Sequence, residues 1–344
     1  MSQQKKILVT GGTGYIGSHT CVELLQAGYE VVIIDNLSNS DAGMVDRIAE
    51  IAGKKPTFYK ADMTDKSAID NIFHTEKNIF SAIHFAAYKA VGESVNKPLM
   101  YYANNLNSLI NLLDLSLEHS INNLVFSSSC TVYGQPEKLP VTEQTPVVRP
   151  ESPYGNTKRI SEEMMEDFYA AYQSFKGIAL RYFNPIGAHP SGLIGELPNG
   201  VPNNLIPFVT QTAAGLRDEI KIFGNDYNTT DGTCIRDYIN VVDLAKAHVA
   251  AIDRQAQNKC KQPFEVFNLG TGRGVSVLEI VKGFEEATGV MLNYSMAPRR
   301  AGDVEQIYAN STFAENELNW KAEKTLKETL ASAWNWEKKL RNIQ

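Results

Sequence analysis

Residues 7–17 constrain the fold more than any other part of the chain. A short apolar run ends in a glycine-dense turn, and an amphipathic pattern follows over residues 15–27. Glycines permit a tight turn and let backbone N–H groups approach a pyrophosphate, and the following helix N-terminus adds partial positive charge. One glycine-rich turn is weak evidence, because turns use glycine for many reasons. The glycines that form this turn are Gly11, Gly12, Gly14 and Gly17.

The next apolar run strengthens the interpretation of the turn. It predicts a strand over residues 30–34 that ends in Asp35. At this distance from the glycines, an acidic side chain reads the adenosine ribose 2′-OH and repels a 2′-phosphate. Strand, turn, helix, strand and acid together predict a dinucleotide site that prefers NAD to NADP. The alternative is an ordinary βαβ unit whose turn happens to contain glycines.

The remaining pattern predicts an α/β protein. Apolar strand patterns alternate with helical patterns, the longest of which cover 98–119 and 153–175. This alternation is typical of a Rossmann-type doubly wound parallel sheet with helices on both faces. The expected strands cover 6–10, 30–34, 57–61, 82–86, 124–128 and 178–183.

The regular alternation of strand and helix patterns ends at Pro185. Residues 189–204 are rich in glycine and proline and predict a long irregular loop, with shorter strands and helices beyond it. We therefore expect an NAD-binding domain over 1–186 and a smaller C-terminal α/β substrate domain over 187–344. Some C-terminal elements are expected to pack back onto the first domain. The later helical patterns cover 241–254, 276–288 and 324–340.

Composition excludes several classes of partner. The net charge is −6 and the basic residues form no stripe, so no nucleic-acid partner is expected. The apolar runs are too short for a membrane span, and polar residues 1–6 predict no secretion signal. Four cysteines without a C-x-x-C pair indicate reduced thiols in a cytoplasmic protein, and the histidines lack H-E-x-x-H spacing, so no metal site is predicted. The cysteines are Cys21, Cys130, Cys234 and Cys260.

A candidate catalytic pair begins the helix predicted from residue 153. Ser152 and Pro153 favour a helix start, and Tyr154 and Lys158 then lie four residues apart on one face. A lysine ammonium and a positively charged oxidised nicotinamide would both favour the tyrosine phenolate. Moving a tyrosine pKa from about 10 toward 7 needs roughly 4 kcal/mol. This arrangement predicts a general base for proton transfer.

Spacing alone does not identify that base, because Tyr172 and Lys176 share it. We expect the second pair to be a packing tyrosine and a lysine near the end of the same helix. Tyr154 differs because it follows a serine-rich strand end, where Ser129 can hydrogen-bond the oxygen on which Tyr154 acts. The alternative for Ser129 is a buried serine that caps a strand.

Together these motifs resemble the bacterial UDP-glucose (UDP-galactose) 4-epimerases, which belong to the extended short-chain dehydrogenase/reductase family, over nearly the whole chain. The C-terminal motifs are more specific than the glycine turn. Departures from the pattern are Ala87 where glycine is usual, Cys130 after the serines, and Ile307. The matching segments are 11–19, 35–37, 84–86, 89–94, 127–129, 154 with 158, 181–185, 202–205, 222–227, 236–238 and 297–303.

The resemblance implies interconversion of UDP-glucose and UDP-galactose through a transient 4-keto sugar, with NAD held tightly between turnovers. Tyr154, Lys158 and Ser129 would carry the chemistry, while Arg236 and Arg300 would clamp the diphosphate. It also implies a homodimer built on the helices near 98–119 and 153–175. The implied NAD contacts are Gly11, Gly14, Tyr15, Ile16, Gly17, Asp35, Asn36, Asp62, Met63, Phe85, Lys89, Asn104, Tyr154, Lys158 and Phe183. The implied contacts to the UDP-hexose are Lys89, Ser129, Asn184, Asn204, Leu205, Arg236, Tyr238, Arg300, Asp303 and Ile307.

Two other functions and one detail of specificity remain open at this point. A 4,6-dehydratase or decarboxylase of the same fold needs an acid or base where this chain has Cys130 and Thr131. A non-catalytic NAD-sensing regulator has no need for the tyrosine, lysine and serine together. Ile307 stands where relatives confined to glucose and galactose carry tyrosine, so the resemblance implies room for N-acetylated UDP-sugars. A register slip of one residue would place Tyr308 there instead.

Overall fold

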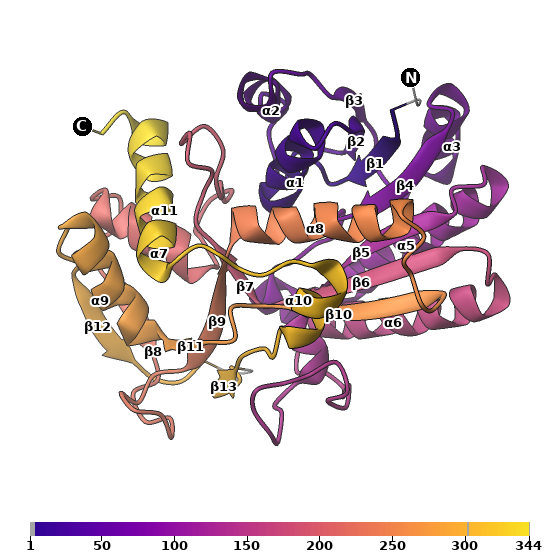
Figure 1. Cartoon of the computed structure of the whole chain (residues 1–344). Helices are drawn as coiled ribbons and strands as arrows, with labels where there is room; N and C mark the ends of the chain where they lie inside the picture. The colour runs from indigo at the N-terminus through magenta and orange to yellow at the C-terminus, as the bar shows by residue number, and fades with distance from the viewer. Residues whose placement is uncertain (1–3, 301–302, 344) are drawn as a thin grey trace.

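A seven-stranded parallel sheet forms the centre of the molecule in the computed structural model, which describes residues 4–300 and 303–343. The first three residues of the polar N-terminal segment lie outside this description. The strand order is β10-β6-β5-β4-β1-β2-β3, so the chain winds outward from β1 in both directions (Figure 1). The strands are β1 (Lys6–Thr10), β2 (Glu30–Asp35), β3 (Thr57–Lys60), β4 (Ile79–His84), β5 (Asn123–Ser129), β6 (Lys176–Tyr182) and β10 (Phe264–Leu269).

Alternating side chains divide the core between the two faces of this sheet. In β1, Ile7 and Val9 point to one face and Leu8 points to the other, and all three are fully buried. The first face is covered by α1 (Tyr15–Gln26), α2 (Met44–Ala52) and α8 (Val241–Ala256). The second is covered by α3 (Lys66–Thr75), α5 (Pro98–Glu118) and α6 (Pro153–Ala171). The Rossmann-type doubly wound α/β fold is confirmed.

A smaller second unit lies beside the carboxyl ends of the central strands. Its mixed sheet is organised around β9, which pairs with β7, β11 and β13, and a separate two-stranded sheet joins β8 to β12. Its helices pack around a second apolar core (Figure 1). The elements are β7 (Asn184–Ile186), α7 (Leu205–Ala213), β8 (Ile220–Phe223), β9 (Ile235–Asn240), β11 (Gly274–Ser276), α9 (Val277–Thr288), β12 (Tyr294–Ala297), β13 (Gln306–Ile307) and α11 (Leu326–Arg341).

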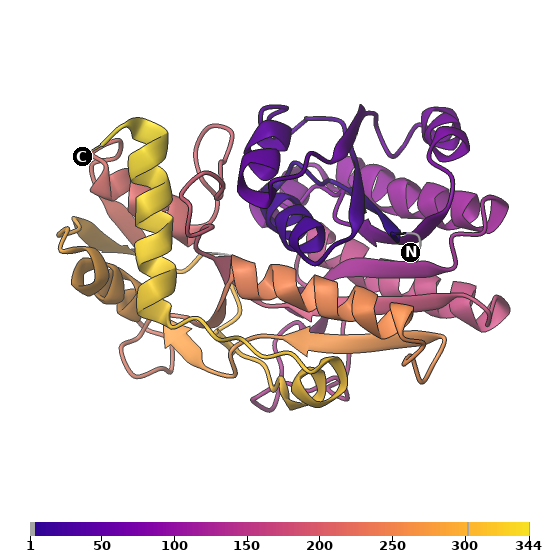
Figure 2. The same cartoon turned by 45° about the horizontal axis from the view of Figure 1, so that its top comes forward.

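Two late elements return to the large sheet. The strand β10 extends its edge beside β6, and α8 packs along α1, as Figure 2 shows. The short elements α4 (Val91–Asn96), η1 (Cys130–Tyr133) and α10 (Thr312–Leu318) complete the fold. Within the described ranges, no helix has both the length and the apolar composition needed to cross a membrane.

The end of α6 differs from the sequence expectation. Tyr172 is the C-cap residue of α6, and Lys176 is the first residue of β6. The prediction that Lys176 lies near the end of the helix was therefore wrong. The Lys176 amide donates to the Asn122 carbonyl at 2.7 Å, so strand pairing sets its position. The helix spacing that pairs Tyr154 with Lys158 does not exist for Tyr172 and Lys176.

Candidate active site

The predicted site residues gather where the carboxyl ends of the parallel strands face the second unit. In doubly wound sheets this edge carries the ligand crevice. Ser129 ends β5, Asp35 ends β2, and Phe85 follows β4 directly. From the second unit, β7 pairs with β9 so that Asn184 lies opposite Tyr238. The sheet connection therefore places predicted cofactor and substrate residues on facing elements.

The glycine turn leaves no room for side chains. A Cβ on Gly17 would lie 2.3 Å from the Gly11 carbonyl oxygen, and Gly11 itself has a φ of +71°. Gly14 is the N-cap of α1, so Tyr15, Ile16 and Gly17 supply the first backbone N–H groups of that helix. Such groups lack partners within the helix and attract anions. This tight, glycine-lined helix start fits the pyrophosphate of a dinucleotide.

The adenosine side of the predicted site is preorganised by hydrogen bonds. Asp35 accepts the Thr13 amide at 3.1 Å and the Leu37 amide at 2.9 Å. Asn36 donates to Asp62 at 2.8 Å. The Met63 carbonyl accepts a hydrogen bond of 2.9 Å from Asn111 of α5. Four predicted NAD contacts, Asp35, Asn36, Asp62 and Met63, therefore follow two adjacent strands and are held by neighbouring backbone and amide groups.

Ser129, Tyr154 and Lys158 meet between β5 and α6. The hydroxyl of Ser152 accepts the Gly155 amide at 3.1 Å and so caps α6, as predicted. Tyr154 then lies in the first turn of α6, near enough to Ser129 for that side chain to affect its pKa. One turn later, the buried Lys158 ammonium donates to the Ser127 carbonyl at 2.6 Å. The strand end and the helix start thus bring the three predicted groups together.

Burial is the largest influence on the pKa values of Tyr154 and Lys158. Burial raises the pKa of Tyr154 to about 12, while the Ser129 side chain works in the opposite direction. Burial also lowers the pKa of Lys158 to about 7, against the opposing effect of Glu162. The predicted lowering of the tyrosine pKa relies on oxidised nicotinamide together with Lys158, and it stays a prediction.

A buried ion pair that sequence reasoning missed lies beneath this site. Glu162, one turn after Lys158 on α6, binds the Arg181 guanidinium of β6, with an Nε–Oε1 distance of 2.9 Å. Ser128 donates to the same carboxylate, and Arg181 also donates to the Tyr133 hydroxyl at 2.9 Å. These groups fix α6 against β5 and β6. An i,i+4 spacing from Lys158 was the available signal for Glu162.

Lys89 and Asn204 meet through a residue that the sequence did not single out. The Glu196 carboxylate accepts from Lys89 at 3.0 Å and from Asn204 at 2.6 Å. The Glu196 backbone carbonyl accepts from Trp336 at 3.0 Å, which anchors the 189–204 loop on α11. Lys89 follows β4 and Asn204 precedes Leu205 at the start of α7. Glu196 therefore connects a predicted cofactor contact with a predicted substrate contact.

Arg236 and Arg300 converge on Asp303. The Arg300 guanidinium binds Asp303 at 2.7 Å, and the Arg236 guanidinium lies 4.0 Å from the same carboxylate oxygen. Two cations facing one carboxylate present donors suited to phosphate oxygens.

Two further predicted contacts lie elsewhere in the structure. Asn104 donates to Asn105 at 2.9 Å, and Leu205 packs against the core of the second unit.

Ile307 is the last residue of β13. It is buried in one apolar cluster with Cys130 and Phe183. Tyr308 points to the other side of the segment, because a Cβ on Gly274 would lie 3.0 Å from the Tyr308 ring. The alternation of side chains therefore places isoleucine, not tyrosine, in the cluster that contains Cys130.

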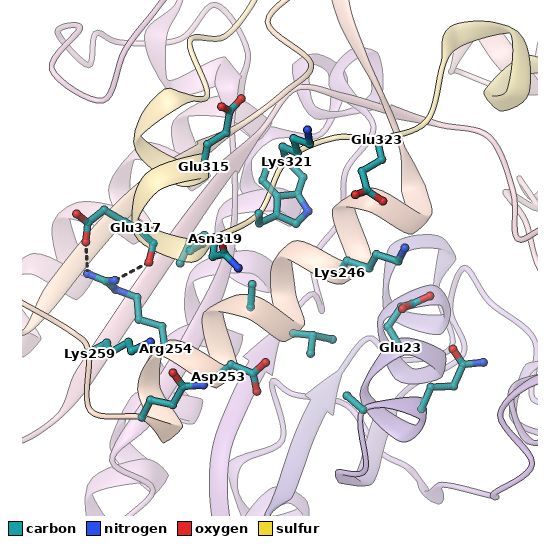
Figure 3. Close-up of a pocket in the computed structure, with 17 residues that line it drawn as sticks. Glu23, Lys246, Asp253, Arg254, Lys259, Glu315, Glu317, Asn319, Lys321 and Glu323 are labelled. Atoms are coloured by element: carbon teal, nitrogen blue, oxygen red, sulfur yellow. Dashed lines mark hydrogen bonds and ion pairs between the residues drawn. The ribbon is translucent and has the colours of Figure 1, made fainter.

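A separate groove lies on the far side of α8. It has a volume of about 840 Å³ and is lined from α1, α8 and the segment around α10 (Figure 3). Its charged groups include Arg254, which binds Glu265 at 2.9 Å and Glu317 at 3.0 Å. None of the predicted site residues is among the described residues that line it. This groove is distinct from the candidate active site.

Comparison with known proteins places this geometry in a family. Residues 8–333 match the profile described as GDP-mannose 4,6 dehydratase. UDP-glucose 4-epimerase GEPI48 of Cyamopsis tetragonoloba is 53% identical over 98% of this chain and 96% of that protein. UDP-glucose 4-epimerase of Bacillus subtilis is 50% identical over 96% of both chains. The structure of UDP-glucose 4-epimerase from Bifidobacterium longum in complex with NAD+ and UDP covers 99% of this chain and 100% of its own, with a TM-score of 0.94 and 47% identity.

Near-complete coverage excludes a match limited to the dinucleotide-binding half. The similarity spans the second unit, where Arg236, Arg300 and Ile307 lie. Within the broader family that the profile describes, these relatives are epimerases rather than dehydratases. The chain belongs to the UDP-glucose 4-epimerase family.

Proposed function

We propose that this protein interconverts UDP-glucose and UDP-galactose with tightly held NAD. The observation that carries the proposal is the meeting of Ser129, Tyr154 and Lys158 at the end of β5, beside a helix start shaped for a pyrophosphate. Family membership supports it, because the closely similar relatives are named UDP-glucose 4-epimerases. NAD is further supported by the neighbouring structure that holds NAD+ and UDP.

The residues divide the work of epimerisation. When bound, NAD supplies a hydride acceptor and, in its oxidised form, the positive charge that Tyr154 needs. Tyr154 takes the proton of the sugar 4-hydroxyl and later returns it, while Ser129 orients that oxygen. Arg236 and Arg300 hold the diphosphate, so the 4-keto sugar can turn about its bond to the phosphate. Such a turn would expose the opposite face of C4, so that the stereochemistry is inverted with no net redox change.

A dehydratase function is less well supported by the same site. It needs an acid or base at the positions of Cys130 and Thr131. Burial raises the pKa of the Cys130 thiol to about 12, so the thiol stays neutral near pH 7. A threonine hydroxyl is no better as a base. The regulator alternative leaves the tyrosine, serine and lysine without a purpose.

The test is an assay of purified protein with UDP-galactose and no added nicotinamide nucleotide. Formation of UDP-glucose is expected, because a cofactor that is regenerated each turnover can remain bound. NAD should also survive gel filtration with the protein. Full activity only after addition of free NAD would contradict tight retention, and a 4-keto-6-deoxy product would identify a dehydratase.

Acceptance of UDP-GlcNAc and UDP-GalNAc is part of the proposal. Its support is Ile307 in the cluster with Cys130 and Phe183. By resemblance, relatives confined to glucose and galactose carry the larger tyrosine at this position. Ile307→Tyr should abolish N-acetylhexose epimerisation and retain the glucose reaction, since overpacking costs about 1–3 kcal/mol. Tyr308→Phe is the matched control on the opposite side. If the wild type ignores UDP-GlcNAc, or Ile307→Tyr still accepts it, Ile307 is not the gate.

A homodimer built on α5 and α6 is also proposed. The exposed side of α5 carries an apolar stripe that includes Leu99, Ala103 and Ile110. The Ile110 side chain, for example, is 47% exposed in the isolated chain. Such a stripe is typical of a helix that packs on a partner. Sedimentation should give twice the chain mass, and Ile110→Arg should shift it toward the monomer. A monomeric wild type would contradict the proposal.

A cytoplasmic location is proposed as well. Reduced thiols, as in Cys21, support it.

A further inference from the structure

Three possible metal ligands meet on the outer side of α3. Asp70 and His74 lie one helical turn apart on α3, and His119 caps the C-terminus of α5. The ring nitrogens His119 Nε2 and His74 Nε2 face the same Asp70 oxygen, at 2.6 and 3.6 Å. The three ligand atoms all lie within 4.8 Å of one another.

These separations suit a small tetrahedral cation. Metal–ligand bonds of about 2.0–2.1 Å in a tetrahedral zinc site place neighbouring ligand atoms about 3.3 Å apart. The His74–Asp70 separation of 3.6 Å is already close to that value, and the His119–Asp70 separation of 2.6 Å has to open by less than 1 Å. The His74 side chain is 69% exposed, so it has freedom to adjust.

The surrounding charges favour a divalent cation. Lys66 is the nearby positive group, and its ammonium binds Glu118 at 2.9 Å and also binds Asp114. This one lysine faces three carboxylates, those of Asp70, Asp114 and Glu118.

We propose that Asp70, His74 and His119 bind one zinc ion or a similar divalent transition-metal ion, with water in the fourth position. Two imidazoles and one carboxylate are the ligand types that zinc accepts, whereas magnesium and calcium prefer sites made of oxygen ligands. The ion joins the end of α3 to the end of α5. The sequence predicted no metal site because H-E-x-x-H spacing is lacking. That motif describes ligands on one helix, whereas here the third ligand, His119, follows a second helix, and the Asp70-x-x-x-His74 spacing was the local signal.

The ion is expected to stabilise the fold without taking part in the reaction. It binds the native chain, where α3 and α5 meet, and the unfolded chain holds no such preformed arrangement. The helices α3 and α5 end just before β4 and β5 begin, so the proposed metal site lies at the amino end of the sheet. Ser129 and Tyr154 lie at the carboxyl end. Metal binding should therefore raise the melting temperature and leave epimerase turnover unchanged.

The experiment is a calorimetric titration of NAD-containing protein with zinc after treatment with EDTA. All variants carry Cys260→Ser, because this partly buried thiol is the cysteine that added zinc could reach. We expect one zinc per chain, a higher melting temperature, and at least a ten-fold loss of affinity in both His74→Ala and Asp70→Asn. Cobalt should bind with the visible absorption of a tetrahedral site.

Asp114→Asn provides the matched control, since it removes an exposed carboxylate of α5 outside the triad. This variant should lose clearly less zinc affinity than Asp70→Asn does, because it removes a neighbouring charge but no ligand atom. Absence of binding in the parent would overturn the proposal. So would equal affinity in His74→Ala, or equal losses in Asp114→Asn and Asp70→Asn, because either result would indicate general charge attraction.

Discussion

At the scale of single residues, the two tyrosines that share a lysine spacing give the sharpest test of the catalytic assignment. Tyr154 is held against Ser129, whereas Tyr172 is 45% exposed at the end of α6 and packs on Phe168. Tyr154→Phe should retain NAD and lower turnover by about 10²-fold or more, because it removes a positioned base. Tyr172→Phe should change turnover less than two-fold by the same argument. Equal losses in both, measured with UDP-galactose, would refute the assignment.

Glu196 supports a second test at this scale. Glu196→Gln keeps an oxygen for Asn204 but removes the charge that holds the half-exposed Lys89. A pair with this exposure contributes about 0.2–1 kcal/mol, so the KM for UDP-galactose should rise by up to about five-fold while kcat changes little. The difference should shrink in 1 M salt, because screening weakens the wild-type pair. A salt-independent effect, or a loss confined to kcat, would exclude this positioning role.

At the scale of elements, the glycine turn makes a prediction that propensity alone would reverse. Alanine favours helices, yet Gly17→Ala at the start of α1 would place a Cβ 2.3 Å from the Gly11 carbonyl. The turn must then move, so weaker NAD retention and a lower melting temperature are expected. Both are measured by bound-nucleotide absorbance after gel filtration and by thermal unfolding.

The control for that prediction is Gly92→Ala in α4. A Cβ there would meet no described atom within 4 Å, so retention and stability should equal or exceed the wild type. If Gly17→Ala retained NAD as well as Gly92→Ala does, close packing of the turn would not be what shapes the pyrophosphate site.

The same scale shows how far sequence reasoning reaches. Six strands of the large sheet were predicted, because βαβ units repeat a local pattern that apolar alternation reveals. The seventh strand, β10, was not assigned to the sheet, since its pairing with β6 joins segments far apart in the chain. The end of α6 was misplaced for a similar reason: pairing of Lys176 with the residues before β5 competes with a helical pattern.

Within the site, sequence reasoning identified residues that local patterns bring together and missed a contact that depends on long-range folding. Tyr154 and Lys158 share one helix turn, and Ser129 ends a recognisable strand, so local rules bring them together. Glu196 lies in an irregular loop, and its link between Lys89 and Asn204 depends on where that loop folds. The pKa of Tyr154 was also beyond sequence reasoning, because burial raises it in a way that spacing does not reveal.

At the scale of the whole molecule, three buried histidines predict loss of stability in acid. Burial lowers the pKa values of His19 and His84 to about 3 and that of His248 to about 4. In the unfolded chain the histidine pKa is about 6.5. Below that pH the unfolded state binds protons at these histidines, whereas the folded state leaves them unprotonated. Stability contributed by these groups is therefore present above pH 6.5 and is lost as the pH falls toward 4. Each fully protonating site contributes a slope of about 1.4 kcal/mol per pH unit.

His248→Gln isolates one of these contributions. His248 lies in α8 against Phe85 and Tyr182, and its Nδ1 faces the Leu244 carbonyl at 2.9 Å, a contact that a glutamine amide can replace. The variant loses packing and is expected to be less stable at pH 7.5. Between pH 5.5 and 4.5, however, its free energy of unfolding should fall less steeply than that of the wild type, by about 1.4 kcal/mol per pH unit. Urea unfolding with saturating NAD measures both slopes, and carboxylates shared by the two proteins cancel in the difference. Parallel slopes would mean that His248 does not remain neutral in the folded protein.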